Sequence, residues 1–164
     1  MKTLVIYQSS TGFTQKYANW IAEELSSEAK ELKKVSINDV QNADRIIFGG
    51  WIMGGMIMGL DKIRKMNPKN LVVFAVGASA DCDENRKNLI TQNNLSDIPF
   101  YYFEGGIAFE RMKFLPRTML KMMGKSVAKK ENKTPQDIEM EKIFAGSFDH
   151  TDKSNIEDMV SHLK

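Results

Sequence analysis

The sequence predicts an α/β domain with a doubly wound, five-stranded parallel sheet and helices on both faces. Three observations support this fold class. Apolar, β-branched or aromatic runs recur along the first two thirds of the chain, segments with helical periodicity separate most of them, and the connections are short. In such a domain the ligand binds at the carboxyl ends of the strands. The predicted strands span residues 3–7, 32–37, 45–49, 71–77 and 100–104.

The helices between these strands begin and end at recognisable positions. The first follows the first strand and is expected to end near Ala29. A second spans residues 58–66, where Asn67 and Pro68 stop it, and a third spans 83–93. The face of the first helix that turns toward the core comprises Tyr17, Trp20, Ile21 and Leu25.

The last third of the chain departs from this alternation. A basic, methionine-rich segment at about 106–134 follows the fifth strand. Thr134 is a predicted N-cap, with Pro135 at the first position of the helix that follows. A final helix is expected at 152–163. We therefore expect a single domain over residues 1–164 that carries an extra segment. The core-facing residues of the final helix are Ile156, Met159, Val160 and Leu163.

Size and composition indicate a globular, cytoplasmic domain. A chain of 164 residues buries roughly 70% of the surface that it exposes when unfolded. Its single cysteine forms no intramolecular disulfide, which suits a reducing compartment. The strand-like run begins within a few residues of Met1, so we expect no signal peptide. Five glycines interrupt the longest apolar stretch, 48–60, which is also too short to span a bilayer.

The net charge of +2 hides a strongly basic segment. Residues 111–133 contain eight basic residues against one acid, Glu131, so the remaining chain carries a net charge of −5. From Lys113 to Lys129 a basic residue recurs every four positions, and apolar residues occupy another face at helical spacing. This pattern predicts a basic amphipathic helix within Arg111–Lys130. Such a helix either makes a peripheral contact with an anionic membrane or a partner groove, or packs on the sheet with a solvated basic face. Nothing in the sequence indicates nucleic-acid binding.

A hydroxyl-rich loop follows the first strand and opens the first helix. It offers backbone N–H groups and hydroxyls at a helix N-terminus, where the helix dipole favours an anion. No Lys or Arg precedes Lys16 in this loop, so it would hold a phosphate mainly with neutral donors. The candidate phosphate-binding residues are Ser9, Ser10, Thr11, Gly12, Phe13 and Thr14.

Other phosphate-binding motifs do not fit the chain. Residues 124–126 have the Gly-Lys-Ser ending of a P-loop, but Met119 occupies the first glycine position and no strand precedes it. The dinucleotide motif G-x-G-x-x-G does not occur. A phospho-acceptor receiver domain needs acidic residues after the first and third strands, where this chain has Gln8-Ser9 and Gly49-Gly50.

The first strand, loop and helix together resemble the N-terminal signature of the flavodoxin family. Residues 5–21 match it as Val-Ile-Tyr-x-Ser-x-x-Gly-x-Thr-x-x-x-Ala-x-x-Ile. The resemblance implies a flavodoxin-like sheet with strand order 2-1-3-4-5. It also implies that residues 9–14 hold the 5′-phosphate of FMN. The alternative is a Ser/Thr-rich turn that only caps the helix.

Two further loops fall where this fold would place the flavin ring. After the third strand, Trp51 could stack on the isoalloxazine ring, and the glycines beside it would let a peptide flip toward the flavin. The alternative is a core tryptophan on a glycine-rich turn. After the fourth strand, small residues would let backbone N–H groups approach the ring edge. The candidate residues are Gly50, Trp51, Ile52, Met53, Gly54 and Gly55 in one loop and Ala78, Ser79 and Ala80 in the other.

The last third of the chain resembles in layout the menaquinone-dependent protoporphyrinogen oxidase family, which is flavodoxin-like and binds FMN. The residues that carry this resemblance are the segment from Gly105-Gly106-Ile107-Ala108 onward and Thr151-Asp152 before the last helix. The resemblance implies either an oxidoreductase of that type or an electron carrier. Its partner would be a redox protein, a quinone or a small-molecule substrate. The alternative is a flavin-free binding or membrane-surface module that uses the basic helix. We expect no catalytic side chain and no metal site, since His150 and His162 lack metal-ligand spacing.

Overall fold

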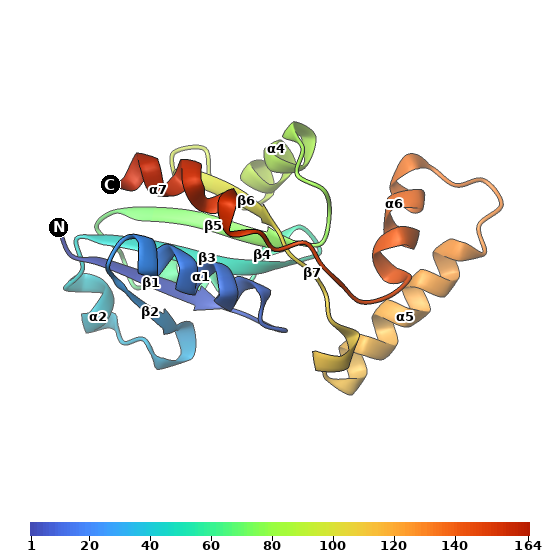
Figure 1. The fold of residues 1–164 in the computed structure, drawn as a ribbon, viewed down its shortest axis with the longest axis horizontal. Coiled ribbons are helices and arrows are strands. Elements are labelled where there is room, and N and C mark those ends of the chain that lie inside the picture. Colours follow the sequence, from blue (N-terminus) through green and yellow to red (C-terminus); the bar gives the residue numbers. More distant parts are fainter.

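The computed structural model describes residues 1–164 and contains the predicted parallel sheet (Figure 1). The strand order is β2-β1-β3-β5-β6, which is the 2-1-3-4-5 order of the five parallel strands in sequence. The fold class and the strand order are thus confirmed. The parallel strands are β1 (Thr3–Gln8), β2 (Glu28–Glu31), β3 (Arg45–Met53), β5 (Leu71–Gly77) and β6 (Phe100–Glu104).

Helices cover both faces of this sheet and bury a core on each. One face carries α1 (Phe13–Glu24) and α7 (Glu157–Leu163), and the other carries α2 (Ile37–Gln41), α3 (Leu60–Lys65) and α4 (Asp83–Gln92). Short 3₁₀ turns at Leu32–Lys34 and Lys153–Ile156 lead into α2 and α7. The core residues under α1 and α7 include the fully buried Tyr17, Ile21, Ile47, Phe74 and Met159.

The second strand lies four residues before the predicted 32–37, and that prediction was wrong. The first helix ends at Glu24, and Ser26 adopts a left-handed conformation with a φ of 48°, so the chain turns early into Glu28–Glu31. β2 pairs on one side only, with β1, and its residues are mostly charged. A polar edge strand carries no apolar signal, whereas the apolar residues after it form a 3₁₀ turn and the start of α2.

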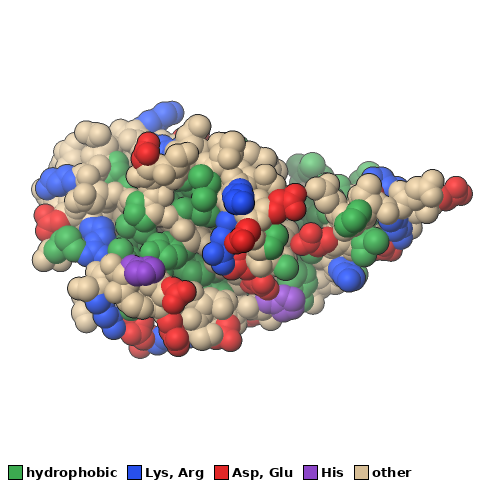
Figure 2. Space-filling model, turned by 90° about the horizontal axis from the view of Figure 1, so that it is seen from above, with side chains coloured by type: hydrophobic (Ala, Val, Ile, Leu, Met, Phe, Trp, Pro, Cys, Tyr) green, Lys and Arg blue, Asp and Glu red, His purple; other side chains and the backbone are tan.

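The segment after the fifth strand forms a projecting helical hairpin (Figure 1). It begins with β7 (Gly106–Ile107) and returns through β8 (Phe148–Asp149), which pairs with β7 antiparallel. Between them lie a 3₁₀ turn (Phe109–Arg111), α5 (Phe114–Ala128) and α6 (Pro135–Phe144). The segment therefore runs to Asp149, beyond the expected 134. The space-filling view shows the molecule narrowing toward this hairpin (Figure 2).

The predicted basic amphipathic helix is α5, but it does not pack on the sheet. Val127 is its only buried residue, and its close neighbour is α6, where Gly124 lies against Phe144. The alternative of a helix packed on the sheet with a solvated basic face is therefore wrong. The predicted cap of α6 is present, since Thr134 Oγ1 accepts a hydrogen bond from the N–H of Asp137 at 3.1 Å. No helix in the structure combines the length and the apolar character needed to cross a membrane.

The hydroxyl of Tyr17 joins three parts of the chain beneath α1. It donates to the carbonyl oxygen of Glu104 at 2.7 Å, and it accepts from the Asp152 N–H at 3.2 Å and from Asn155 Nδ2 at 3.0 Å. Its ring stacks on Phe103 with 4.9 Å between centroids. Burial raises the pKa of Tyr17, so the hydroxyl stays protonated. This contact fixes α1 against the end of β6 and against the chain that returns from the hairpin.

Replacing Tyr17 by Phe would leave these polar partners without their hydroxyl. We expect the free energy of unfolding, measured in urea, to fall by about 2 kcal/mol. Tyr7→Phe is the matched control, because Tyr7 is also buried and its hydroxyl makes no hydrogen bond within the protein. That change should cost less than about 0.5 kcal/mol. Equal losses in the two variants would contradict the role of the Tyr17 hydroxyl.

Candidate functional site

The structure brings the three predicted loops to one edge of the sheet. β1, β3 and β5 are neighbours, and their carboxyl ends lie side by side. Gln8 at the end of β1 pairs with Gly50, and Trp51 pairs with Val76 one residue before the end of β5. The candidate residues that follow each strand are therefore adjacent in space, because paired strands lie about 4.8 Å apart.

The loop after β1 presents hydrogen-bond donors that the protein itself leaves unpaired. Gly12 is the N-cap of α1 with a left-handed φ of 107°, and its N–H donates to Ser9 Oγ at 3.1 Å, which closes the turn. Because the first N–H groups of a helix point out along its axis, these donors face the space beyond the N-terminus of α1. The residues whose backbone N–H groups make no hydrogen bond within the protein include Ser10, Thr11, Phe13 and Thr14.

Thr14 and Phe13 contribute differently to this loop. Thr14 is 1% exposed, and its hydroxyl has no partner within the protein. The ring of Phe13 is buried and lies against Gly105 and Gly106, so only the backbone of Phe13 is free for a ligand. A set of neutral donors at a helix N-terminus, including the hydroxyl of Thr14, fits a phosphate group.

Arg111 adds a positive charge to this loop from the hairpin. Its guanidinium Nη1 donates to the Thr11 carbonyl oxygen at 3.3 Å. The expectation of a loop with mainly neutral donors did not include this cation, because Arg111 lies 100 residues away in sequence. Lys16, which does belong to α1, is engaged elsewhere: its ammonium contacts Asp149 at 3.2 Å and Thr151 Oγ1 at 2.6 Å. No pattern near residues 9–14 could have revealed Arg111.

The segment after the third strand is a hairpin rather than a loop. β3 continues through Gly50, Trp51, Ile52 and Met53, and then pairs antiparallel with β4 (Met56–Ile57). Gly54 and Gly55 form the two-residue turn with φ values of 57° and 79°, a combination that glycine adopts without strain. A glycine pair between two apolar pairs is itself a hairpin signal that could have been recognised.

Hydrogen bonds from Asn93 and from within the hairpin hold its backbone in place. The structure therefore gives no support to the predicted peptide flip beside Trp51. Asn93 is 2% exposed; its Nδ2 donates to the Gly55 carbonyl oxygen and its Oδ1 accepts from the Ile57 N–H, each at 2.9 Å. The carbonyl oxygen of Trp51 accepts from the Met58 N–H, also at 2.9 Å. Trp51 is half-buried, so part of its ring remains free for a contact.

The loop after β5 is held by the neighbouring strand. Tyr102, in β6, donates its hydroxyl to the Ser79 carbonyl oxygen at 2.6 Å, and burial raises the pKa of Tyr102, which keeps it a donor. The N–H of Asp81 donates to Glu104 Oε1 at 2.9 Å. Ala78 and Ser79 are half-buried and Ala80 is exposed. Small side chains on a fixed backbone leave room for a planar ligand to approach.

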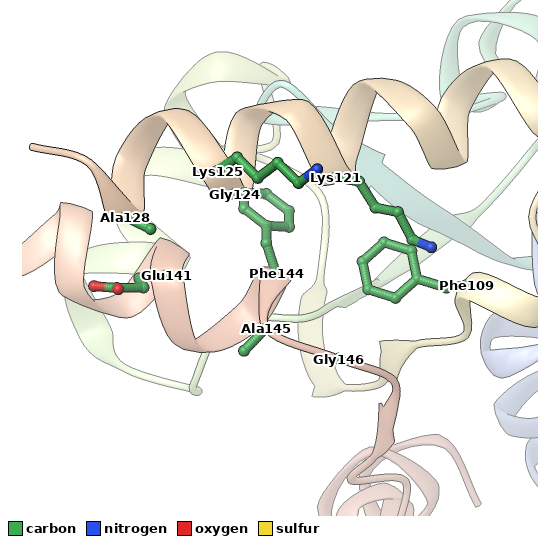
Figure 3. Close-up of a pocket in the computed structure, with 9 residues that line it drawn as sticks. All are labelled: Phe109, Lys121, Gly124, Lys125, Ala128, Glu141, Phe144, Ala145 and Gly146. Atoms are coloured by element: carbon green, nitrogen blue, oxygen red, sulfur yellow. The ribbon is translucent and has the colours of Figure 1, made fainter.

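A separate hollow of about 510 Å³ lies between α5 and α6 (Figure 3). The ammonium of Lys121 lies over the ring of Phe109 there, 5.7 Å from its centroid, and Phe144 lies beside Gly124. None of the candidate cofactor residues lines it. The hollow belongs to the hairpin and not to the edge of the sheet.

Residues 4–135 match the flavodoxin domain. The chain belongs to this family. An uncharacterized protein of Methanocaldococcus jannaschii is 36% identical over 83 residues, a match that covers 47% of this chain and 55% of that protein. The chain thus spans about half the length of this relative.

Solved structures with a similar arrangement include a flavodoxin, a flavoprotein and an oxidoreductase. A flavodoxin from the domain Archaea has 13% identity and a TM-score of 0.47, with 99% of this chain and 100% of that chain covered. A flavoprotein in complex with FMN from Lactobacillus acidophilus has 20% identity and a TM-score of 0.44, with 63% and 91% covered. Rubredoxin oxygen:oxidoreductase from Desulfovibrio gigas has 14% identity and a TM-score of 0.45, with 98% and 36% covered.

Gly12→Ala tests the backbone of the loop after β1. At a φ of 107° a side chain is strained, so we expect a loss of about 1–2 kcal/mol in stability, measured by thermal unfolding. The added Cβ would lie 3.5 Å from Arg111 Nη1, an ordinary contact, so the loss reports backbone strain rather than a clash. Gly146→Ala, in open space and without a positive φ, is the control. Similar melting temperatures for the two variants would contradict this reading of Gly12.

Proposed function

We propose that this flavodoxin-domain protein binds FMN at the carboxyl edge of its sheet and takes part in electron transfer. The observation that supports the proposal most directly is the set of unpaired donors between Ser10 and Thr14 at the N-terminus of α1. Membership of the flavodoxin family gives these donors a ligand of matching chemistry, a phosphate attached to a flavin.

In this proposal each of the three segments has its own task. Residues 9–14 bind the phosphate with neutral donors, and Arg111 adds a positive charge beside them. The exposed part of Trp51 covers one face of the ring, and Ile52 to Gly55 border it. Residues 78–80 present their backbone to the ring edge. The bound flavin would supply the redox chemistry, while the protein orients it and limits access of water.

Two kinds of redox protein fit this site. One is an electron carrier that passes electrons to a partner protein. The other is an oxidoreductase of the protoporphyrinogen-oxidase type that acts with a quinone or a small molecule. The helical segment between β7 and β8 is the feature of this chain that an oxidoreductase of the second kind would use.

The absorbance spectrum of the isolated protein tests the proposal. We expect flavin bands, release of FMN identified by mass spectrometry, and reversible bleaching on stepwise reduction. A distinct one-electron stage during reduction would indicate a carrier. Oxidation of protoporphyrinogen IX with menaquinone would establish the narrower activity, and no turnover with FMN bound would exclude it. A protein that neither contains nor takes up FMN would contradict the proposal and favour a flavin-free module.

Arg111→Gln tests whether the hairpin contributes to the phosphate site. If its guanidinium binds the phosphate, the dissociation constant of FMN should rise about tenfold. The dissociation constant of riboflavin, which has no phosphate, should stay unchanged, as measured by quenching of flavin fluorescence. Arg117→Gln is the control, since its guanidinium makes no contact with the loop. Equal FMN affinity in wild type and Arg111→Gln would remove Arg111 from the site but leave the flavin proposal intact.

A further inference from the structure

The outer side of α5 exposes a row of large apolar side chains. Phe114 is 75% exposed and Leu115 is 68% exposed, although such residues usually lie inside a domain. Positions 115, 119, 122 and 123 follow helical spacing, so these side chains form one stripe along the helix. The apolar members of this α5 face are Phe114, Leu115, Met119, Met122 and Met123.

Nothing else in the chain covers this stripe. The hairpin projects from the sheet at the end of the molecule opposite to both termini (Figure 1), and α5 packs against α6 through its other side, at Gly124 and Val127. A contiguous apolar surface on a helix that contributes so little to the core marks an interaction site.

Unpaired positive charge accompanies the stripe. Of the eight basic residues in 111–133, Lys130 pairs with Asp137 at 2.7 Å and Lys133 pairs with Glu141 at 2.6 Å. The others make no ion pair with a carboxylate. These basic residues follow a different face of the helix from the apolar stripe, and two of them, Lys121 and Lys125, line the hollow beside α6. The residues of this basic side are Lys113, Arg117, Lys121, Lys125 and Lys129.

We infer that the α5 face binds the surface of an anionic lipid bilayer. The apolar side chains would enter the boundary between headgroups and acyl chains, and the lysines and arginine would contact lipid phosphates. Charge complementarity requires an anionic surface. A bilayer also accepts a single convex helix without a matching groove, and unbranched methionines adapt to its irregular packing. This inference does not depend on flavin binding.

Vesicle sedimentation tests the inference with the full-length protein. We expect binding to vesicles of equal parts phosphatidylserine and phosphatidylcholine, little binding to phosphatidylcholine alone, and release as the salt concentration rises. Met119→Ser should weaken binding about tenfold. Ile37→Ser is the matched control: Ile37 is 54% exposed in α2, Met119 is 56% exposed, and the control should bind as wild type does.

The charge contribution needs a second variant. Lys113→Gln combined with Arg117→Gln should weaken binding to the anionic vesicles at least tenfold and leave the circular dichroism spectrum unchanged. No binding of wild type at low salt, equal binding to both kinds of vesicle, or equal effects of Met119→Ser and Ile37→Ser would overturn the inference. A concentration-dependent dimer that Met119→Ser converts to a monomer, without vesicle binding, would also overturn it and assign the face to a second copy of the chain.

Discussion

The position of α1 depends on the Tyr17 hydroxyl, and the site depends on the position of α1. Three groups from distant parts of the chain converge on that single oxygen: the carbonyl of Glu104, the N–H of Asp152 and the side chain of Asn155. A rotation of this helix would turn the free donors at its N-terminus away from the edge of the sheet. The packing of the Tyr17 ring on Phe103 also holds α1 in place.

The hairpin is connected to the same region on two sides. Arg111 contacts the loop before α1, and Lys16 in the first turns of α1 contacts Asp149, where the chain returns. β7 and β8 pair directly beneath these contacts. The base of the hairpin is therefore part of the candidate site, while its α5 face lies farther out. A partner bound to α5 would bring the carboxyl edge of the sheet close to that partner.

The hairpin itself owes little to a hydrophobic core. Val127 is buried, but the apolar row on α5 faces outward, so local polar contacts carry much of its order. Asp137 is central among them. The Lys130 ammonium, together with the N–H and hydroxyl of Thr134, lowers the pKa of Asp137 to about 2. These contacts therefore persist at neutral pH and weaken as the pH falls below about 4 toward that pKa, where the carboxylate is protonated.

The sequence by itself determined the order of the central strands, the amphipathic character of α1 and α5, and which three segments meet at the edge of the sheet, although one of these segments is a hairpin and not a loop. Strands β5 and β6 begin and end where their apolar runs do, because a buried strand must be apolar on both faces. The sequence did not determine β2, which is a polar edge strand. It also did not reveal the hydrogen bonds by which Asn93 holds the β3–β4 hairpin. Only the tertiary structure decided that Arg111 lies beside Thr11 and that the apolar side of α5 stays uncovered. Both depend on where the hairpin leaves the sheet, and local periodicity carries no information about contacts 100 residues apart.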